Sequence, residues 1–134
     1  MIVDFPPGTG DVQISMSQKL KLDGTLIVTT PQLLSLKDVV RGINMFIKVG
    51  VPILGVVENM SYLEEDNQKK YIFGESKTKS ILLKENVSLI EELPFNLNIP
   101  KSCDEGKPYC FDYKDDYSKQ FENITSAITN KFNN

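Results

Sequence analysis

Four short apolar runs, separated by segments with helical spacing, constrain the fold of this chain more than any other feature. The runs are MIVDF (1–5), TLIVTT (25–30), ILGVVEN (53–59) and VSLIEELP (87–94). The first three are nearly continuous rather than alternating, which is typical of strands that are covered on both faces. The order of strand, helix and strand predicts right-handed crossovers, and therefore an α/β fold with a parallel sheet of about four strands flanked by helices.

Helices are predicted between these runs and at the end of the chain. One lies between Pro31 and Gly50, with Thr30 at its start and Pro52 beyond its end, and a shorter one covers 76–86. In the last segment one face of a helix carries Tyr113, Tyr117, Phe121, Ile124, Ile128 and Phe132. This apolar face predicts a terminal helix that docks on the sheet.

Length and composition exclude several classes of protein. With 134 residues the chain is expected to be a single domain, residues 1–134. The net charge is -3 and no basic cluster exceeds a pair such as Lys69–Lys70, which argues against nucleic acid as the partner. No apolar run approaches the roughly 18 residues that span a bilayer, and no signal peptide is evident, so no membrane partner is expected. The absence of His leaves carboxylates, backbone amides and a metal for any catalysis.

The stretch VDFPPGTGD (3–11) shares its PPGTG core with Walker A loops, which have the pattern GxxxxGK(S/T). However, Phe5 occupies the position of the leading glycine and Asp11 the position of the lysine. A carboxylate about 4 Å from a phosphate oxygen costs roughly 4 kcal/mol at an effective dielectric near 20, and the attraction of a lysine is lost as well. The Walker A interpretation therefore fails.

The same stretch fits a different nucleotide motif. Asp4 follows an apolar strand, and a carboxylate there can hold Mg²⁺ directly or through water. Gly8 and Gly10 allow backbone amides to approach a γ-phosphate. A strand that ends in a Pro-Gly turn with a capping Asp remains an open alternative.

Further motifs occur in a fixed order along the chain: LIVTTPQ, RGINMFIKVGVPILGVVENMSY, IFGE, ELPFNLNI and SCDEGKP. Together with VDFPPGTGD they cover about residues 2–110, and the chain resembles the Mrp/Nbp-type iron–sulfur cluster carrier ATPases, a branch of the MinD/ParA-like P-loop proteins. The spacing near LNI is similar to that of the mitochondrial Nubp-like members, which serve respiratory complex I. The resemblance implies a homodimer that binds ATP and Mg²⁺ between subunits and delivers a bridging 4Fe–4S cluster to apo iron–sulfur proteins.

The resemblance also implies roles for individual residues. Asp4 corresponds to the Walker B acid near Mg²⁺, and the γ-phosphate switch comprises Pro7, Gly8, Thr9 and Gly10. Asn59 corresponds to the asparagine that reads the adenine edge, because its amide offers a donor and an acceptor. The segment that lines the base pocket comprises Pro94, Phe95 and Asn96.

Structural interpretations remain open for some of these residues and are preferred for others. Asn59 also fits a cap at a strand end. Glu58 and Asp11 are interpreted as solvated or capping groups rather than catalytic bases. Arg41 is interpreted as a surface residue of its helix, and a role in a dimer is left open.

The chain departs from the family pattern in its phosphate loop. The family carries Walker A in an N-terminal strand and helix, whereas GK(S/T) occurs nowhere in this sequence. We therefore expect the C-terminal half of a P-loop ATPase domain, with a gap in the sheet beside the Asp4 strand and an exposed apolar edge. This chain alone is not expected to hydrolyse ATP.

The second departure concerns the cluster. Family members carry CxxC shortly after NMS, where this chain has Glu65 and Gln68 at about the positions of the thiolates. Neither suits a cluster that prefers sulfur, so 4Fe–4S binding by this chain is doubtful. Cys103 and Cys110 lie outside the motif and are interpreted as free thiols, with cluster ligation left open.

The sequence thus favours an ATP-binding iron–sulfur cluster carrier or assembly protein. Its expected partners are a second copy or a missing N-terminal half, and apo iron–sulfur proteins. A degenerate or split module of the same fold, which binds a partner without catalysis, is the alternative, and a MinD/ParA-type positioning ATPase fits the motifs less well. A cytoplasmic location is expected, with a mitochondrial one as the alternative.

Overall fold

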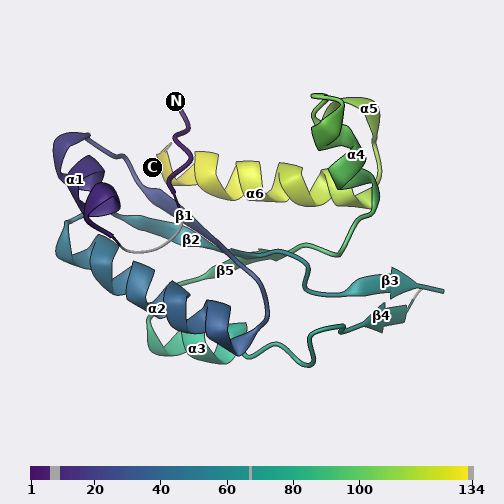
Figure 1. Ribbon diagram of the computed structural model, residues 1–134, viewed down its shortest axis with the longest axis horizontal. Helices are drawn as coiled ribbons and strands as arrows, with labels where there is room; N and C mark the ends of the chain where they lie inside the picture. Colours follow the sequence, from purple (N-terminus) through teal and green to yellow (C-terminus); the bar gives the residue numbers. More distant parts are fainter. Residues whose placement is uncertain (7–9, 67, 133–134) are drawn as a thin grey trace.

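A three-stranded parallel sheet forms the centre of the computed structural model, which describes residues 1–6, 10–66 and 68–132 (Figure 1). The strands are β1 (Thr25–Thr29), β2 (Ile53–Glu58) and β5 (Leu89–Glu92), in the order β1-β2-β5. Both pairings are parallel. The parallel α/β sheet predicted from the apolar runs is confirmed, and three of the four predicted strands lie within two residues of their expected bounds.

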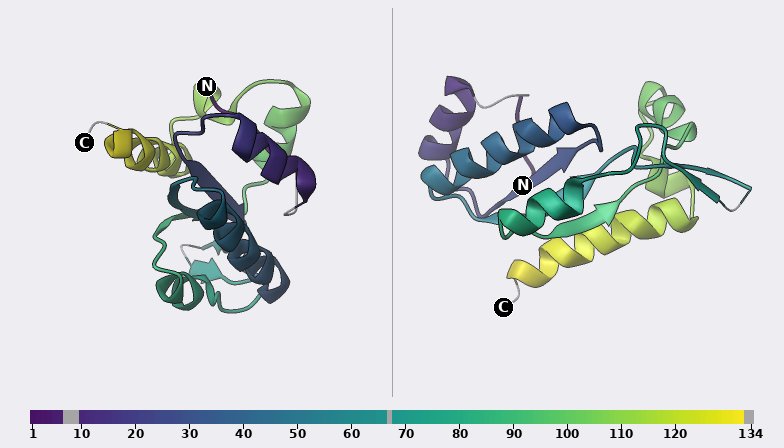
Figure 2. Two further views of the ribbon diagram at one scale, coloured as in Figure 1. Left: turned by 90° about the vertical axis from the view of Figure 1, so that its left-hand side faces the viewer. Right: turned by 90° about the horizontal axis from the view of Figure 1, so that it is seen from below.

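Helices cover both faces of the sheet. α2 (Leu33–Lys48) and α3 (Thr78–Lys84) lie on one face, and α6 (Asp116–Phe132) lies on the other (Figure 2). All three were predicted, α2 and α6 from apolar spacing, and the docking of the terminal helix on the sheet is confirmed. Within the described ranges, no helix is both long and apolar enough to cross a bilayer.

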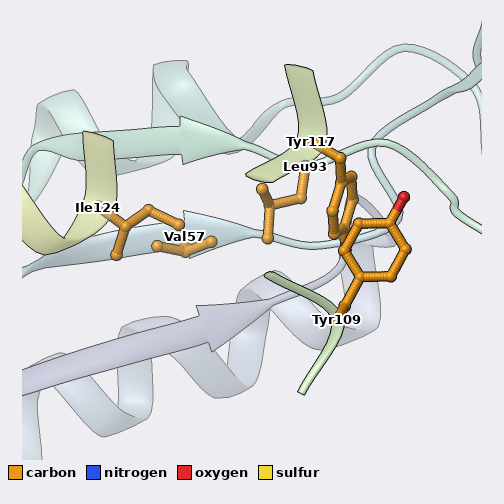
Figure 3. Close-up of a cluster of buried hydrophobic side chains, with 5 residues drawn as sticks. All are labelled: Val57, Leu93, Tyr109, Tyr117 and Ile124. Carbon is orange, nitrogen blue, oxygen red and sulfur yellow. The ribbon is translucent and has the colours of Figure 1, made fainter. Parts of the chain in front are cut away.

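Two adjacent residues of β2 belong to the two cores on opposite faces of the sheet. Val56 packs with Val39, Ile43 and Leu82 from α2 and α3. Val57 belongs to the cluster on the other face, which contains Leu93, Tyr109, Tyr117 and Ile124 (Figure 3). Successive side chains of a strand point to opposite faces, so the continuous apolar run of β2 supplies both layers.

Five shorter elements were not predicted. They are α1 (Asp11–Lys19), α4 (Asn98–Asp104), α5 (Tyr109–Asp112) and an antiparallel hairpin of β3 (Leu63–Glu65) and β4 (Gln68–Lys70). α1 has few apolar residues, α4 and α5 are at most two turns long, and the hairpin strands are mainly polar. None of these segments is long and apolar enough for a period to be read from the sequence.

The strand predicted over residues 1–5 is wrong for this structure. Residues 1–6 form no strand, and Ile2 is exposed. A strand gains its backbone hydrogen bonds only from a neighbour, so an apolar run alone does not create one. β1 is the edge of the described sheet, and 62% of Val28 is exposed there. The gap and apolar edge were expected beside an Asp4 strand, which this structure does not have, and the exposed apolar residue lies on β1 instead.

Gly55 in β2 permits a close contact with β5. Its φ is +152°, and a Cβ at this position would lie 2.6 Å from Ile90 Cγ1 and 3.0 Å from the Ser88 carbonyl oxygen. We expect Gly55→Ala to lower the free energy of unfolding by about 2–3 kcal/mol, measured by urea denaturation. In α2, a Cβ on Gly42 would meet nothing within 4 Å. Gly42→Ala is the control and should stabilise the protein by about 0.5–1 kcal/mol; equal losses in the two variants would contradict this account.

Candidate functional site

The carboxyl ends of β2 and β5 form one edge of the sheet, and the two segments that follow these strands remain hydrogen-bonded to each other. Leu93 N donates to the Glu58 carbonyl at 2.8 Å, Ser61 N to the Leu93 carbonyl at 2.9 Å, and Phe95 N to the Tyr62 carbonyl at 2.7 Å. The β3–β4 hairpin and α4 follow at the same end of the molecule (Figure 1). Ligands of parallel α/β sheets bind outside this edge, so it is the first place to look for a site.

An open groove of about 490 Å³ lies at this edge, between the β3 segment, the loop after β5 and the start of α6. It is lined by Tyr62, Leu63, Glu64, Pro94, Phe95, Asn96, Leu97, Asp115, Asp116, Tyr117 and Gln120. The volume is in the range of small-molecule sites, roughly 300–1,000 Å³. Three residues predicted to line a base pocket, Pro94, Phe95 and Asn96, therefore do line a groove.

The groove combines aromatic and acidic side chains. Tyr62 and Tyr117 offer ring faces or edges, and Gln120 offers an amide. Glu64 and Asp116 contribute carboxylates, which repel phosphate. Such a wall suits a planar, uncharged heterocycle better than the phosphates attached to it.

Asn59 lies at the same edge but does not line the groove. Its backbone N–H donates to the Thr29 carbonyl at 2.7 Å, which joins the ends of β2 and β1. Its side-chain Oδ1 accepts a hydrogen bond from Met60 N at 2.9 Å, and Met60 has a left-handed φ of 55°. Asn59 Nδ2 donates to no group in the described part of the chain and is free for a ligand. The amide thus acts partly as a strand-end cap, as the structural alternative predicted.

A hydrogen-bonded network holds one wall of the groove. Asn96 Nδ2 donates to Tyr109 Oη at 3.0 Å, and Tyr109 Oη donates to Asp115 Oδ2 at 2.6 Å. Asp115 Oδ1 accepts from Ser118 N at 2.9 Å, which is the contact of an N-cap residue. Sequence reasoning missed Tyr109 and Asp115. Asp115 had a readable signal, an Asp directly before an amphipathic helix, whereas nothing in the sequence marked Tyr109.

The network displaces two pKa values in opposite directions. Burial, together with the hydrogen bond to Asp115, raises the pKa of Tyr109 above 10.0. Burial acts to raise the pKa of Asp115 as well, but the hydrogen bonds from Tyr109 and Ser118 outweigh it and lower that pKa below 3.8. The stability from Asp115 is therefore present above pH 3.8 and is lost as the pH falls through its lowered pKa. The stability from Tyr109 is present below pH 10.0 and is lost as the pH rises through its raised pKa.

Tyr109→Phe should remove part of the alkaline loss of stability. Between neutral pH and pH 11, wild type should lose more free energy of unfolding than the variant does. The two losses should differ by less than about 1 kcal/mol, because Asp115 is exposed to solvent. Urea denaturation at the two pH values measures both losses. Tyr113→Phe is the control, since the Tyr113 ring stacks on Tyr109 at 4.4 Å but its hydroxyl has no partner among the described residues. The same pH dependence in wild type and Tyr109→Phe would contradict the assignment.

The residues predicted to sense phosphate are not brought to the groove. Asp4 is exposed in segment 1–6, while Pro7, Gly8 and Thr9 lie outside the described residues. Gly10 is the N-cap of α1, and Asp11 lies exposed in its first turn, as a solvated or capping group would. Figures 1 and 2 show segment 1–6 toward the end of the sheet opposite the hairpin. Within the described part no cluster of three metal-binding side chains exists, so Asp4 fits Mg²⁺ only as one ligand beside waters and phosphates.

The hairpin occupies the place of the expected cluster motif. Glu65 and Gln68 are directly opposite partners in its ladder, and Glu65 forms an ion pair with Lys70. The hydrogen bond and charge of Lys70 lower the pKa of Glu65. A carboxylate, an amide and an ammonium do not form a site for an iron–sulfur cluster. The free thiols lie elsewhere, with Cys103 exposed on α4 and Cys110 half-buried on α5.

Two further interpretations can be compared with the structure. Arg41 is exposed on α2 and pairs with Asp38 at 3.0 Å, which confirms a surface residue. It borders a second groove of about 370 Å³ between α2 and α3, which none of the strand-end residues lines. Glu58 was interpreted as solvated or capping, and this is wrong: its side chain is fully buried and accepts hydrogen bonds from three hydroxyl groups. The reason is that its partners Ser76 and Thr78 come from a distant part of the chain.

Comparisons with known proteins identify the family of the chain and support its fold. Residues 1–129 match the model of a ParA family described as NUBPL iron-transfer P-loop NTPase. The chain is 50% identical over 110 residues to an Arabidopsis thaliana protein named iron-sulfur protein required for NADH dehydrogenase, mitochondrial. It is 42% identical over 131 residues to the iron-sulfur cluster transfer protein NUBPL of Dictyostelium discoideum. A nucleotide-binding protein of Archaeoglobus fulgidus, solved with ADP, is 38% identical with a TM-score of 0.66.

These matches cover most of this chain but less than half of each similar protein. The alignments include 81% of the chain and 35% of the Arabidopsis protein, and 96% of the chain and 41% of the Dictyostelium protein. The structural match includes 76% of the chain and 43% of the Archaeoglobus protein.

Proposed function

Because the chain belongs to the ParA family of NUBPL-type iron-transfer P-loop NTPases, we propose that it forms the base-reading part of an ATP-binding iron–sulfur cluster carrier. The groove beside Pro94–Asn96 at the carboxyl edge of the sheet carries this proposal. The similarity to a nucleotide-binding protein solved with ADP supports it. The whole carrier would bind the nucleotide with further residues, including a Walker A loop.

Each predicted site residue has a role in this proposal. The nucleobase lies along Pro94, Phe95 and Asn96, and Asn59, which lies at the same edge outside the groove, donates from Nδ2 to the part of the base that extends beyond the groove. The Tyr109–Asp115 network fixes the Asn96 wall. Segment 7–10 senses the γ-phosphate, and Asp4 holds Mg²⁺ through water once the phosphates are in place. Mg²⁺ would neutralise phosphate charge there.

The cluster is the cargo of such a carrier, and this chain does not supply the usual thiolates for it. Glu65 and Gln68 occupy the hairpin positions, and both cysteines lie on other elements. A second copy of this chain carries the same Glu65 and Gln68, so we propose that the cluster ligands come from a different segment of the carrier, such as the one that supplies the Walker A loop, and that the assembly serves apo iron–sulfur proteins. Anaerobic reconstitution with iron and sulfide should give this chain no Cys-dependent visible absorbance.

A second function is favoured by two observations. The apolar edge of β1 is open at Val28, and the hairpin carries an ion pair where a cluster site would require sulfur. Both suit a non-enzymatic module that pairs with another chain through its sheet edge. The two functions differ in nucleotide binding, which only the carrier requires.

Asn59→Ala tests the proposed base contact. Titration of Mg-ADP into the 134-residue chain should show binding that the variant weakens about fivefold to thirtyfold, because one hydrogen bond contributes about 1–2 kcal/mol. Asn44→Ala is the matched control, since Asn44 is exposed on α2 and donates only to the Val40 carbonyl. Binding that Asn59→Ala leaves unchanged would contradict the contact, and no binding at all would favour the interaction module.

The location of the protein is a further proposal. The Arabidopsis protein is named as mitochondrial, which supports the mitochondrial alternative to a cytoplasmic location. A fluorescent fusion expressed from the native gene would distinguish the two compartments.

A further inference from the structure

Glu58 is a buried carboxylate that the proposed function does not use. It is the last residue of β2, and its exposed fraction is 0%. Within the described ranges no ion pair reaches it. Removing a carboxylate from water is costly unless hydrogen bonds replace the water, and an apolar side chain of similar size would serve stability at least as well. Its presence here therefore points to a role in fixing the position of its partners.

Three hydroxyl groups replace the water around Glu58. Ser61 Oγ donates to Oε1 at 2.6 Å, Ser76 Oγ donates to Oε2 at 2.5 Å, and Thr78 Oγ1 also donates to Oε2. Thr78 N donates to Ser76 Oγ at 3.1 Å, which orients that hydroxyl. Ser61 and Thr78 are buried. Hydrogen bonds to a charged acceptor are about twice as strong as those between neutral groups.

The three partners lie at the two ends of the segment that carries the β3–β4 hairpin, and we call these ends, at Ser61 and at Ser76–Thr78, the roots of the hairpin. Ser61 lies where the chain leaves β2 for the hairpin, and Ser76 and Thr78 lie where it returns to begin α3. Between these points the β3–β4 hairpin projects from the sheet (Figure 1). Tyr62 adds contacts at the root, with Lys69 Nζ 4.0 Å from its ring centroid and the Tyr71 ring at 6.3 Å. One carboxylate thus joins both roots of the hairpin to the end of the central strand.

Glu58 also connects these hairpin roots to the carboxyl edge of the sheet. Asn59 follows Glu58 directly, and the Glu58 carbonyl accepts the hydrogen bond of Leu93 N. Tyr62 and Pro94 of this edge line the groove. The edge and the hydroxyl groups of Ser76 and Thr78 are thus connected through one residue, Glu58.

We propose that Glu58 is a positioning residue that fixes the root of the β3–β4 hairpin to the carboxyl edge and transmits ligand-dependent changes of that edge to the hairpin. The transmission rests on the proposed function, whereas the fixing of the root does not. Glu58 touches neither nucleotide nor cargo in this account, and it acts through the hydroxyls that it holds.

Hydrogen exchange of the 134-residue chain, followed by mass spectrometry, tests the fixing of the root. Glu58→Gln keeps the size of the side chain but removes its charge, and the double variant Ser76→Ala/Thr78→Val removes the returning partners without altering Glu58. In both, amides of residues 62–73 should exchange about tenfold faster, because hydrogen bonds of a buried carboxylate are lost or weakened. Glu92→Gln is the matched control: Glu92 is the β5 residue paired with Glu58 and bonds to Lys79 instead.

The pattern along the chain separates positioning from general stability. Amides of β1 and β2 should exchange as in wild type. If they accelerate by the same factor as the hairpin, Glu58 only stabilises the whole fold and the proposal is overturned. It is also overturned if both variants leave hairpin exchange unchanged. Should Glu58→Gln fail to fold, the double variant decides alone.

Adding Mg-ADP tests the transmission. In wild type, exchange should slow in residues 93–98 and in the hairpin, whereas in Glu58→Gln it should slow only in residues 93–98. A hairpin that responds equally in the variant overturns the transmission. If ADP leaves residues 93–98 of wild type unchanged, the proposed nucleotide site fails, and the ligand-free comparison still decides whether Glu58 fixes the hairpin.

Discussion

The 134-residue chain is expected to hydrolyse Mg-ATP no faster than buffer does, and to gain turnover when a Walker A-bearing segment of a related carrier is supplied. The pattern GxxxxGK(S/T) occurs nowhere in residues 1–134, and the only GK, Gly106-Lys107, precedes a proline. A P-loop contributes several amide donors and a lysine to the transferred phosphoryl group. Removal of one preorganised donor typically lowers a rate about 10²- to 10³-fold, so the absence of the whole loop should abolish measurable turnover.

Co-expression offers the sharpest form of this experiment. The Dictyostelium relative is 42% identical to this chain over 131 residues, and the part of it outside the matched 41%, where the family pattern leads us to expect Walker A, is a suitable complement. Phosphate release by the complex should require that segment, and a lysine-to-alanine change in its loop should abolish it. Asp4→Asn in this chain should also reduce it, because Asp4 is proposed to hold Mg²⁺. Turnover by the purified chain alone would contradict the account.

Ile43→Ala in α2 is expected to cause the largest loss of stability. Ile43 has an exposed fraction of 0% and packs with Val39, Val56 and Leu82, where α2 and α3 meet the sheet. Truncation of a fully buried Ile removes about 3–4 kcal/mol, including the term for the cavity left behind. Domains of this size are stable by only about 5–15 kcal/mol, so the variant should unfold at a much lower urea concentration.

The same helix provides the control for that variant. Ile47 is one turn further along α2 and 59% exposed. Because Ala is a better helix former than Ile, Ile47→Ala should remain within about 0.5 kcal/mol of wild type. Equal losses in the two variants would show that α2 does not pack as described.

The central sheet and its main helices could be predicted from the sequence, because the apolar pattern within each segment is enough to identify it. The run that became β2 is continuously apolar because Val56 and Val57 serve cores on opposite faces. α2 and α6 are long enough for their apolar residues to define one face. The segment 1–5 has the same apolar character as β2 but pairs with no strand in the described part of the chain, and composition alone does not reveal whether a pairing strand is available.

The candidate site was readable in part. Pro94–Asn96 line a groove, because residues that follow a parallel strand lie at the carboxyl edge, whereas their contact with a nucleobase stays a prediction. The burial of Glu58 could not be predicted, since its partners Ser76 and Thr78 are 18 and 20 residues away. Tyr109 was missed for the same reason, because its partner Asn96 is 13 residues away. Contacts at such distances depend on the fold, and no local pattern in the sequence records them.

The central claim is that the carboxyl edge of this chain reads the base of a nucleotide, and amide chemical-shift mapping with Mg-ADP tests it most directly. The account predicts shifts confined to Asn59, Phe95, Asn96 and the adjoining start of α6, with weak affinity because the phosphates lack their loop. Adenosine should reproduce these shifts and inorganic phosphate should not. Shifts located in the groove between α2 and α3, or no shifts at millimolar ADP, would contradict the claim.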